Sequence, residues 1–342
     1  ATEQYEAARD TLAEWFGTTR DNLIFTSGTT EAINLVAWGW ARANLGEGDV
    51  VLITEMEHHA DIVPWQLLAE EKKIEIRVVP VITESGTLDM DSFHASVVDA
   101  SLVCVVHTSN VLGTRNPIED IITASKESGA KVMIDCAQAA PHLRIDFKGM
   151  GADFVTISGH KMCGPTGIGC LYIKENILND LQPYQTGGQM IDQVEEYSST
   201  WNDFPFRFEA GTPNIAGVIG LLQALDYINR IGIEKIKSHN QFLTEYCIEK
   251  LNNINNLKVY GHHNATGPVI SFNIKGIHSY DLVQLLAQQN IYIRSGHHCA
   301  QPIMKKLNIE SSSRASLYIY NDLKDIDNFI EGIEKSIKIL LG

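Results

Sequence analysis

Short apolar runs alternate with segments of helical periodicity through the first half of the chain. The runs have the length of buried strands, and the segments between them, such as 29–45 and 118–128, carry apolar residues three and four positions apart. This alternation predicts crossover units around a mostly parallel sheet with helices on both faces. The predicted strands span residues 23–25, 50–53, 76–81, 102–107, 131–135, 154–157 and 169–173.

The pattern changes after a long apolar helix predicted over residues 215–231. The second region ends in a helix whose apolar residues form one stripe, which is typical of a surface that faces a core. We therefore expect a large domain over residues 1–225 and a smaller α+β domain over 226–342. The elements expected in the second region are helices over 234–251 and 280–288 and strands over 269–274, 291–294 and 315–318. The stripe comprises Ile326, Phe329, Ile330, Ile333, Ile337 and Leu340.

Composition and charge narrow the classes of function. The chain has 342 residues, 44% of them hydrophobic, and 27 Lys plus Arg against 42 Asp plus Glu give a net charge of -15. Because this charge repels nucleic-acid phosphates and anionic lipids, we expect neither as a partner. There is no run of about 18 apolar residues and no signal-like start, so we expect no membrane segment. The six cysteines lack a paired framework, which favours a reducing compartment, the cytoplasm.

Lys161 closes a tetrapeptide, Ser-Gly-His-Lys, that follows the predicted strand 154–157. Most lysines are solvated surface charges, and this one alone indicates no more. A lysine held near a cofactor phosphate and pyridinium can instead lose its proton and form a Schiff base with an aldehyde. The other residues that could create this setting also follow predicted strands. In open α/β sheets, ligands bind beyond the carboxyl ends of the strands.

A phosphate site is predicted where residues 27–31, Ser-Gly-Thr-Thr-Glu, follow the first strand and open a helix. Backbone N–H groups, the hydroxyls of Thr29 and Thr30 and the positive end of the helix dipole would converge there. Ser158 and His160 could supply further donors. An ordinary helix N-cap with an acidic first turn explains residues 27–31 equally well.

Asp135 ends the predicted strand 131–135, and Gln138 follows it. A buried carboxylate needs a partner, either an N-cap amide or the protonated nitrogen of a pyridine ring, which then withdraws electrons. Gln138 could reach the phenolic oxygen of such a ring. His58 and His59 follow another strand, but adjacent histidines rarely converge on one ion, so we expect no metal. One imidazole could stack on the ring, and the other could cap a helix.

Cys299 differs from the other cysteines because it lies outside any apolar run, beside His297 and His298. Such surroundings can stabilise an exposed thiolate, although a structural cysteine near a turn fits the same residues. Further on, Arg314 begins a predicted strand. Its guanidinium suits bidentate binding of an α-carboxylate, and pairing with an acidic side chain is the alternative.

Six motifs carry a family resemblance: Gly28-Thr29-Thr30-Glu31, Met56-Glu57-His58-His59-Ala60, Asp135-Cys136-Ala137-Gln138, Ser158-Gly159-His160-Lys161, Phe208-Glu209-Ala210-Gly211-Thr212-Pro213-Asn214 and Arg294-Ser295-Gly296-His297-His298-Cys299. Over nearly the whole chain they resemble the cysteine desulfurases, in the class-V aminotransferase group of fold type I pyridoxal phosphate enzymes. The last motif resembles the second desulfurase group, which includes the SufS-like enzymes, cysteine sulfinate desulfinase and selenocysteine lyase. The resemblance implies an α/β fold with a mostly parallel central sheet and a smaller C-terminal α+β domain.

The resemblance implies a role for each matching residue. Lys161 would bind pyridoxal 5'-phosphate as a Schiff base and act as general base, and Asp135 would pair with the pyridine nitrogen. His58 would stack on the ring, and Gln138 would contact its oxygen. Cys299 would be the nucleophile. The substrate carboxylate would be bound by Asn110 and Arg314, and the cofactor phosphate by Thr29, Thr30, Ser158, His160 and, from the partner subunit of a homodimer, Thr212.

The implied reaction converts L-cysteine to L-alanine and leaves the sulfur as a persulfide on Cys299, for iron–sulfur cluster assembly. A partner protein would collect the sulfur, because the segment between Cys299 and Arg314 is short and poorly able to swing outward. Relatives that serve a zinc-containing, SufU-like acceptor tend to carry histidine where this chain has Tyr280. That difference favours a SufE-like acceptor.

One departure from the family concerns the start of the chain. Family members carry a further segment before the point that matches Ala1, including a loop that helps to close the substrate site, so we expect this segment to be missing. An inactive, truncated scaffold of a sulfur-transfer complex is therefore one alternative. Activity on L-selenocysteine or cysteine sulfinate at the same site is another. A transaminase is disfavoured because it has no need of a thiol at Cys299.

Overall fold

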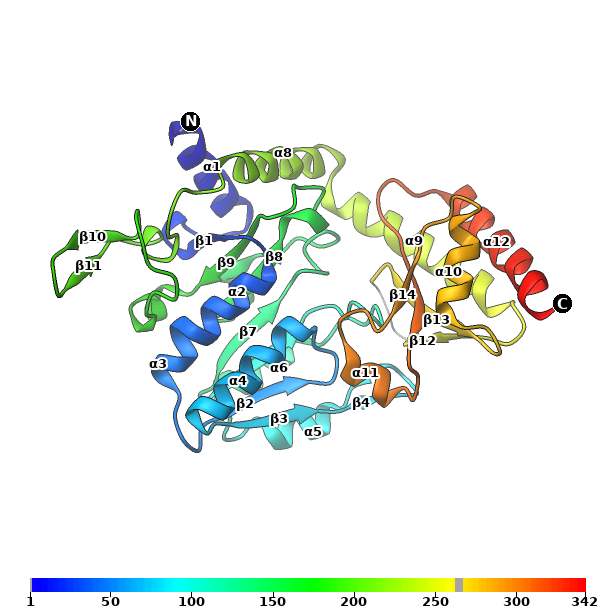
Figure 1. Ribbon diagram of the computed structural model, residues 1–342, viewed down its shortest axis with the longest axis horizontal. Coiled ribbons are helices and arrows are strands. Elements are labelled where there is room, and N and C mark those ends of the chain that lie inside the picture. The colour runs from blue at the N-terminus through cyan, green and yellow to red at the C-terminus, as the bar shows by residue number, and fades with distance from the viewer. Residues whose placement is uncertain (1, 262–266) are drawn as a thin grey trace.

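The computed structural model describes residues 2–261 and 267–342, which form two bodies, each built around its own β-sheet (Figure 1). The larger body contains a seven-stranded sheet with the order β1-β9-β8-β7-β6-β2-β3. Its strands are β1 (Leu23–Thr26), β2 (Val50–Thr54), β3 (Glu75–Val79), β6 (Leu102–Val106), β7 (Lys131–Asp135), β8 (Phe154–Ser158) and β9 (Gly169–Ile173).

The direction of these strands confirms the predicted mostly parallel sheet. From β3 to β8 every neighbouring pair is parallel, and only β9 runs against its neighbours, β8 and β1. Successive side chains of one strand point to opposite faces, so Val103 and Val105 join one apolar core while Leu102 and Cys104 join the other. Because both faces are covered, the central strands are continuous apolar runs in the sequence.

Helices cover both faces of this sheet, as the alternating pattern predicts. The segment expected as one helix over residues 29–45 forms a single rod that ends at Asn44 and includes one π-helical stretch. The first core is covered by α1 (Thr2–Trp15), α5 (Met90–Ser96), α6 (Ile118–Glu127), α7 (Phe147–Met150) and α8 (Ile215–Ile231). The second is covered by α2 (Thr29–Leu35), its π-helical continuation (Val36–Ala41) into α3 (Arg42–Asn44), and α4 (Val63–Lys72).

The smaller body is an antiparallel sheet with the order β12-β13-β15-β14, covered by helices. Ile326, Phe329 and Ile333 of the closing helix are buried in its core, which confirms the predicted stripe. None of the described helices has the length and apolar character that a bilayer crossing requires. The elements are α9 (Ile233–Asn252), β12 (Leu257–Tyr260), β13 (Val269–Ile274), α10 (Ser279–Ala287), β14 (Arg294–Gly296), α11 (Gln301–Lys306), β15 (Ser312–Ser316) and α12 (Leu323–Leu341).

Two predicted strands of the smaller body are wrong in their limits. The strand expected over 291–294 begins only at Arg294, because Ile291 and Ile293 pack against the helix-covered core instead of pairing. The strand expected over 315–318 ends at Ser316 and begins earlier. In the larger body, Pro80 divides the strand expected over 76–81, since proline has no N–H to donate to a sheet. The residues after it form a separate pair, β4 (Val81–Ile82) and β5 (Thr87–Leu88).

Several elements were not predicted, among them β12, α11 and a hairpin in the larger body. A hairpin of β10 (Ile191–Val194) and β11 (Ser199–Trp201) projects from the larger body, at the left of Figure 1. Its side chains are largely exposed, so the sequence carries no buried alternation that would reveal the strands. The division between domains that we propose at residue 225 falls inside α8, which leads through α9 into the smaller body.

Candidate active site

Lys161 ends a 3-10 turn, Gly159–Lys161, that directly follows the buried central strand β8. Gly159 fixes this turn, because its N–H donates to Ile168 O over 2.9 Å and an added Cβ would lie 3.0 Å from the same oxygen. Burial lowers the pKa of the Lys161 ammonium, and the nearby Asp135 carboxylate opposes that shift. Lys161 is therefore easier to deprotonate than a surface lysine.

Asp135 is the last residue of β7, which lies beside β8 in the sheet. Its carboxyl group is buried, and Oδ1 accepts the N–H of Ala137 over 2.8 Å. Burial raises the pKa of Asp135, whereas Lys161 and the Ala137 hydrogen bond lower it. The amide partner considered from the sequence thus takes one carboxylate oxygen. The sheet order places this carboxyl group and Lys161 at the ends of adjacent parallel strands.

His58 lies at the end of the turn that follows β2 and caps the short helix His59–Asp61. Its Nδ1 accepts the N–H of Ala60 over 3.1 Å. His58 thus caps the helix that contains His59, and the ring of His59 in turn caps α11, where its Nε2 accepts the N–H of Gln301. Burial, and then the positive charge of Lys161, lower the pKa of His58 to about 4, so the ring is neutral at pH 7. Its stacking on a cofactor ring stays a prediction.

No metal centre was expected at the histidine pair. Within residues 2–261 and 267–342, no group of three or more His, Cys, Asp or Glu side chains is arranged to hold an ion.

Two of the residues predicted to bind a phosphate, Ser158 and Thr29, meet where the end of β8 lies beside the start of α2. Ser158 Oγ accepts the N–H of Thr29 over 3.0 Å and donates to Thr29 Oγ1 over 3.1 Å. Gly28 allows this approach, because it has a φ of 149° and an added Cβ would lie 3.3 Å from Ser158 Oγ. Thr30 and His160 are exposed on either side. The structure thus brings Ser158 to Thr29 rather than to Thr30.

Thr212 lies apart from these hydroxyls on the surface of the large domain. It is exposed and borders a pocket of ≈ 200 Å³ together with Ser27 and Glu31. Its predicted contribution to a partner subunit's site stays a prediction.

Arg314 and Asn110 lie together, as the resemblance implied. Arg314 Nη1 donates to Asn110 O over 2.9 Å, although the two residues belong to different bodies. Arg314 Nε and Asn110 Oδ1 are buried and have no hydrogen-bond partner among the described residues. Burial, together with the charge of Arg294, lowers the pKa of Arg314 to about 10, so it remains a cation at neutral pH. A donor and an acceptor are thus available for a small polar ligand.

Cys299 lies between β14 and α11, on the side of the smaller body that meets the larger one. Its side chain is partly exposed, and Sγ lies 4.0 Å from Arg294 Nη2. The negative charge of a Cys299 thiolate would raise the pKa of both Lys161 and Arg314. Lys161 and Arg314 line one pocket that Cys299 does not border, and Asn110 links the Cys299 loop to it by accepting from Arg314 and donating to His298 O.

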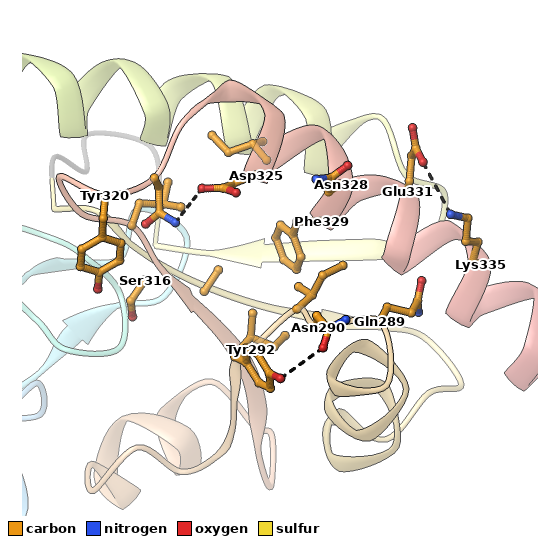
Figure 2. A pocket seen from close by; sticks show the side chains of 16 residues that line it. Gln289, Asn290, Tyr292, Ser316, Tyr320, Asp325, Asn328, Phe329, Glu331 and Lys335 are labelled. Carbon is orange, nitrogen blue, oxygen red and sulfur yellow. Dashed lines mark hydrogen bonds and ion pairs between the residues drawn. The ribbon is translucent and has the colours of Figure 1, made fainter.

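A pocket of ≈ 270 Å³ lies between the two bodies and is lined by residues of both. It is lined by four of the predicted residues, which are Gln138, His160, Lys161 and Arg314. A larger pocket of ≈ 820 Å³ lies in the smaller body, bordered by Phe329, Glu331 and Lys335 of α12 (Figure 2). None of the predicted site residues borders this larger pocket, although Ser316 and Tyr320 border both pockets. The larger of these two pockets is thus not the one that the predicted site residues line.

Two acidic residues beneath His58 were missed by sequence reasoning. Glu57 and Asp61 are fully buried. Glu57 Oε1 accepts from Thr54 Oγ1 and from the N–H of Val106, at 2.7 and 3.0 Å, and Asp61 Oδ1 accepts from Trp65 Nε1 at 2.8 Å. Burial and their mutual repulsion raise the pKa of Glu57, and burial likewise raises that of Asp61. Nothing in the sequence distinguishes these acids from exposed ones.

The donor set fits one kind of ligand. An amine of lowered pKa, a buried carboxylate and hydroxyls at a helix start are what an aldehyde-bearing pyridine with a phosphate group requires. The fold and the site together thus define the class of α/β proteins that hold pyridoxal phosphate through a lysine. Within that class, this chain belongs to the aminotransferase class-V family, whose sequence pattern matches residues 1–329.

Curated relatives and solved structures agree with that assignment. A probable cysteine desulfurase of Halalkalibacterium halodurans is 43% identical over 338 residues, which cover 98% of this chain and 83% of that protein. A cysteine desulfurase of Haloferax volcanii is 42% identical over 338 residues, 98% of this chain and 79% of that protein. The apo cysteine desulfurase of Thermococcus onnurineus has a TM-score of 0.95 at 37% identity, covering 99% of this chain and 85% of that one. The cysteine desulfurase CsdA of Escherichia coli gives 0.95 at 33% identity, with the same coverage.

Proposed function

We propose that this chain is a pyridoxal phosphate-dependent cysteine desulfurase, which converts L-cysteine to L-alanine and retains the sulfur on Cys299. One observation carries the proposal, namely that Lys161 and Asp135 follow neighbouring parallel strands of the large domain, and that His59 and Asn110 of the same domain bind the Cys299 loop of the small one. A transaminase would need the lysine and the carboxylate but has no use for the thiol. Relatives that match over 98% of this chain are named cysteine desulfurases, which supports the same activity.

In this proposal each part of the cofactor is held by a different residue. Lys161 would hold it covalently, Asp135 would keep its ring nitrogen protonated, and Ser158 with the start of α2 would bind its phosphate. When bound, the cofactor supplies a sink for the electrons that accumulate at the substrate α-carbon. His58, being neutral, would stack on the ring without adding a second positive charge.

The chain's own residues would carry out the remaining steps. Arg314 would bind the substrate carboxylate, and its buried, unpartnered Nε provides the donor. Lys161 Nζ would take the α-proton. Cys299 Sγ, as a thiolate, would then attack the substrate sulfur. A sulfur–sulfur bond forms as the carbon–sulfur bond breaks, and the electron pair of the broken bond remains with the carbon. That carbon takes up a proton and Lys161 returns the α-proton to the α-carbon, which gives alanine. No oxidant is needed because a persulfide retains the sulfur.

A homodimer is part of the proposal. The hairpin β10–β11 offers apolar side chains to solvent, with Val194 62% and Tyr197 94% exposed. An isolated two-stranded hairpin is marginally stable in water, so packing against a second copy would stabilise it. Thr212, which is exposed on the same body, could then serve the partner's site. Sedimentation of the purified chain would test the dimer, and a monomer at micromolar concentration would contradict it.

We also propose that the enzyme is SufS-like and supplies sulfur for iron–sulfur cluster assembly in the cytoplasm, with a SufE-like acceptor. The support is the Gly-His-His-Cys loop at Cys299 and the identity of Tyr280, which is 57% exposed at the start of α10. Turnover should be stimulated by a SufE-like protein. Stimulation by a zinc-containing, SufU-like protein instead would overturn the choice of acceptor.

The activity is tested with the purified chain and added pyridoxal phosphate. We expect visible absorption from the bound cofactor, alanine from L-cysteine, and sulfide when a thiol reductant such as dithiothreitol is added to cleave the persulfide. Cys299→Ala should keep the absorption and lose sulfide formation, whereas Lys161→Ala should lose both. Sulfide production that survives Cys299→Ala would refute the persulfide route. L-Selenocysteine in the same assay tests the lyase alternative, because release of selenium by Cys299→Ala would favour it.

A further inference from the structure

The loop that carries Cys299 has a strained backbone. His298 and Cys299 adopt consecutive left-handed conformations, with φ of 53° and 58°. A non-glycine residue in this region is strained and persists only where the surrounding structure holds it in place. The contacts that hold the loop therefore decide where the Cys299 thiol lies.

Two of these contacts come from a single residue of the large domain, His59. Its backbone N–H donates to Cys299 O over 2.8 Å, and its ring Nε2 accepts the N–H of Gln301 over 3.0 Å. A third contact comes from Asn110, whose Nδ2 donates to His298 O over 2.7 Å. The large domain thus binds backbone groups on both sides of the thiol-bearing residue.

His59 supplies a hydrogen-bond acceptor that the small domain lacks at the start of α11. Gln301 is the first residue of α11, and the first N–H groups of a helix have no partner within it. The preceding residue, Ala300, has no side-chain group that could accept a hydrogen bond. The His59 imidazole caps α11 from the other body. Its own backbone N–H, which begins the short helix His59–Asp61, is in turn satisfied by Cys299 O.

The contact also fixes the protonation state of His59. Because Nε2 accepts a hydrogen bond, it carries no proton, and the imidazole is neutral. Burial, and then His297, whose ring centroid is 5.6 Å away, lower the pKa of His59 and favour this state.

We propose that His59 is a positioning residue for sulfur transfer, which holds the Cys299 loop in the conformation from which the thiol reaches the substrate sulfur. This rests on the proposed role of Cys299 as the nucleophile. His59 itself touches neither substrate nor cofactor in this proposal. When its ring acceptor is lost, the loop should relax, so Cys299 becomes more accessible to small reagents and less competent in the reaction.

The test compares variants of the holoenzyme by alkylation with iodoacetamide. His59→Leu removes the ring acceptor, whereas His59→Gln keeps an acceptor, Oε1, in its place. The matched control is His94→Leu, at an exposed histidine of α5. Peptide mass spectrometry follows the modification of Cys299 relative to the exposed Cys163 in the same sample.

We expect His59→Leu to alkylate Cys299 about threefold to tenfold faster relative to Cys163, as the loss of one hydrogen bond implies. Its kcat for alanine formation should fall by a similar factor while KM for cysteine is unchanged, because Asn110 and Arg314 remain. His59→Gln and His94→Leu should stay within about twofold of the parent in both measurements.

Two results would overturn the proposal. One is a His59→Leu variant whose relative alkylation and kcat match those of the parent, and the other is a His59→Gln variant that behaves like His59→Leu. If His59→Leu does not fold, His59→Asn replaces it, because its shorter side chain does not reach Gln301. Failure of the proposed function would look different, since Cys299→Ala would then still release sulfide while the alkylation rates would still report on the loop.

Discussion

Lys161 and Cys299 serve the same proposed reaction but are held in opposite ways. Lys161 follows a central strand that is buried on both faces, and its turn is fixed by the backbone of its own domain. Cys299 lies in a loop with two left-handed residues, which is held partly by its own domain, through His298 and Ser312, and partly by His59 and Asn110 of the other domain. The site thus combines a rigid half, around Lys161, with a half that depends on how the two bodies meet.

This difference follows from the two proposed tasks. The lysine must keep a lowered pKa beside a buried carboxylate, and only a closed environment maintains that balance. The thiol must receive sulfur inside the site and then present it to an outside acceptor. A loop at the junction of two bodies, partly exposed and held by a few hydrogen bonds, suits that double task.

Lys161→Arg keeps a positive charge in the rigid half of the site but removes the amine that can take up a proton. We expect turnover to fall by about 10²–10⁴-fold, because a guanidinium stays protonated and cannot take the α-proton. Alanine formation at saturating cofactor measures the effect, and an unchanged unfolding temperature shows that the fold is intact. Turnover within about tenfold of the parent would mean that another base acts.

Arg314→Lys tests the contact between the two halves of the site, where Arg314 of the small domain donates to Asn110 O of the large one. An ammonium group cannot donate to Asn110 O and also present a fork to a carboxylate. We expect kcat/KM for cysteine to fall by about 10- to 100-fold, mainly through KM, as the loss of a charged hydrogen bond implies. Arg230→Lys, at an exposed site on α8, is the matched control. An unchanged KM would argue against carboxylate binding by Arg314.

Gly169→Ala tests how tightly the rigid half is packed. An added Cβ would lie 2.5 Å from Ile157 O and 2.6 Å from Gly28 Cα, so backbone would have to move. We expect the free energy of unfolding to fall by about 1–3 kcal/mol. Gly188→Ala is the control, because a Cβ there meets nothing within 4 Å. Equal denaturation midpoints for the two variants would show that the close backbone packing around Gly169 does not determine stability.

Asp61→Asn addresses the acid pair beneath His58. Burial raises the pKa of Glu57 and Asp61, so the folded chain binds more protons than the unfolded chain above about pH 4, and its stability falls as pH rises. The variant lacks one of these acids. Its free energy of unfolding relative to the parent should therefore increase between about pH 5 and 8, by at most about 1.4 kcal/mol per pH unit. Urea denaturation measures it, with the exposed Glu119→Gln as control, and a pH-independent difference would contradict the assignment.

The sequence predicts the rigid half well because its signals are local. Asp135 and Lys161 each follow an apolar run, and parallel neighbouring strands bring their carboxyl ends to one edge. The other half depends on contacts between distant residues, such as those of His59 with Cys299 and Gln301, and periodicity carries no information about them. The misplaced strand near Ile291 has a similar cause, since apolar alternation there reflects packing on helices rather than pairing.

The register of β14 and β15 places Arg294 directly opposite Arg314. The guanidinium proposed to anchor the substrate carboxylate and the one nearest the Cys299 thiol are therefore joined through a single backbone ladder. The smaller sheet thus fixes the backbone positions of the two arginines relative to each other. A change in the pairing of β14 with β15 would therefore move both guanidinium groups together, while the large domain would keep the positions of Lys161 and Asp135.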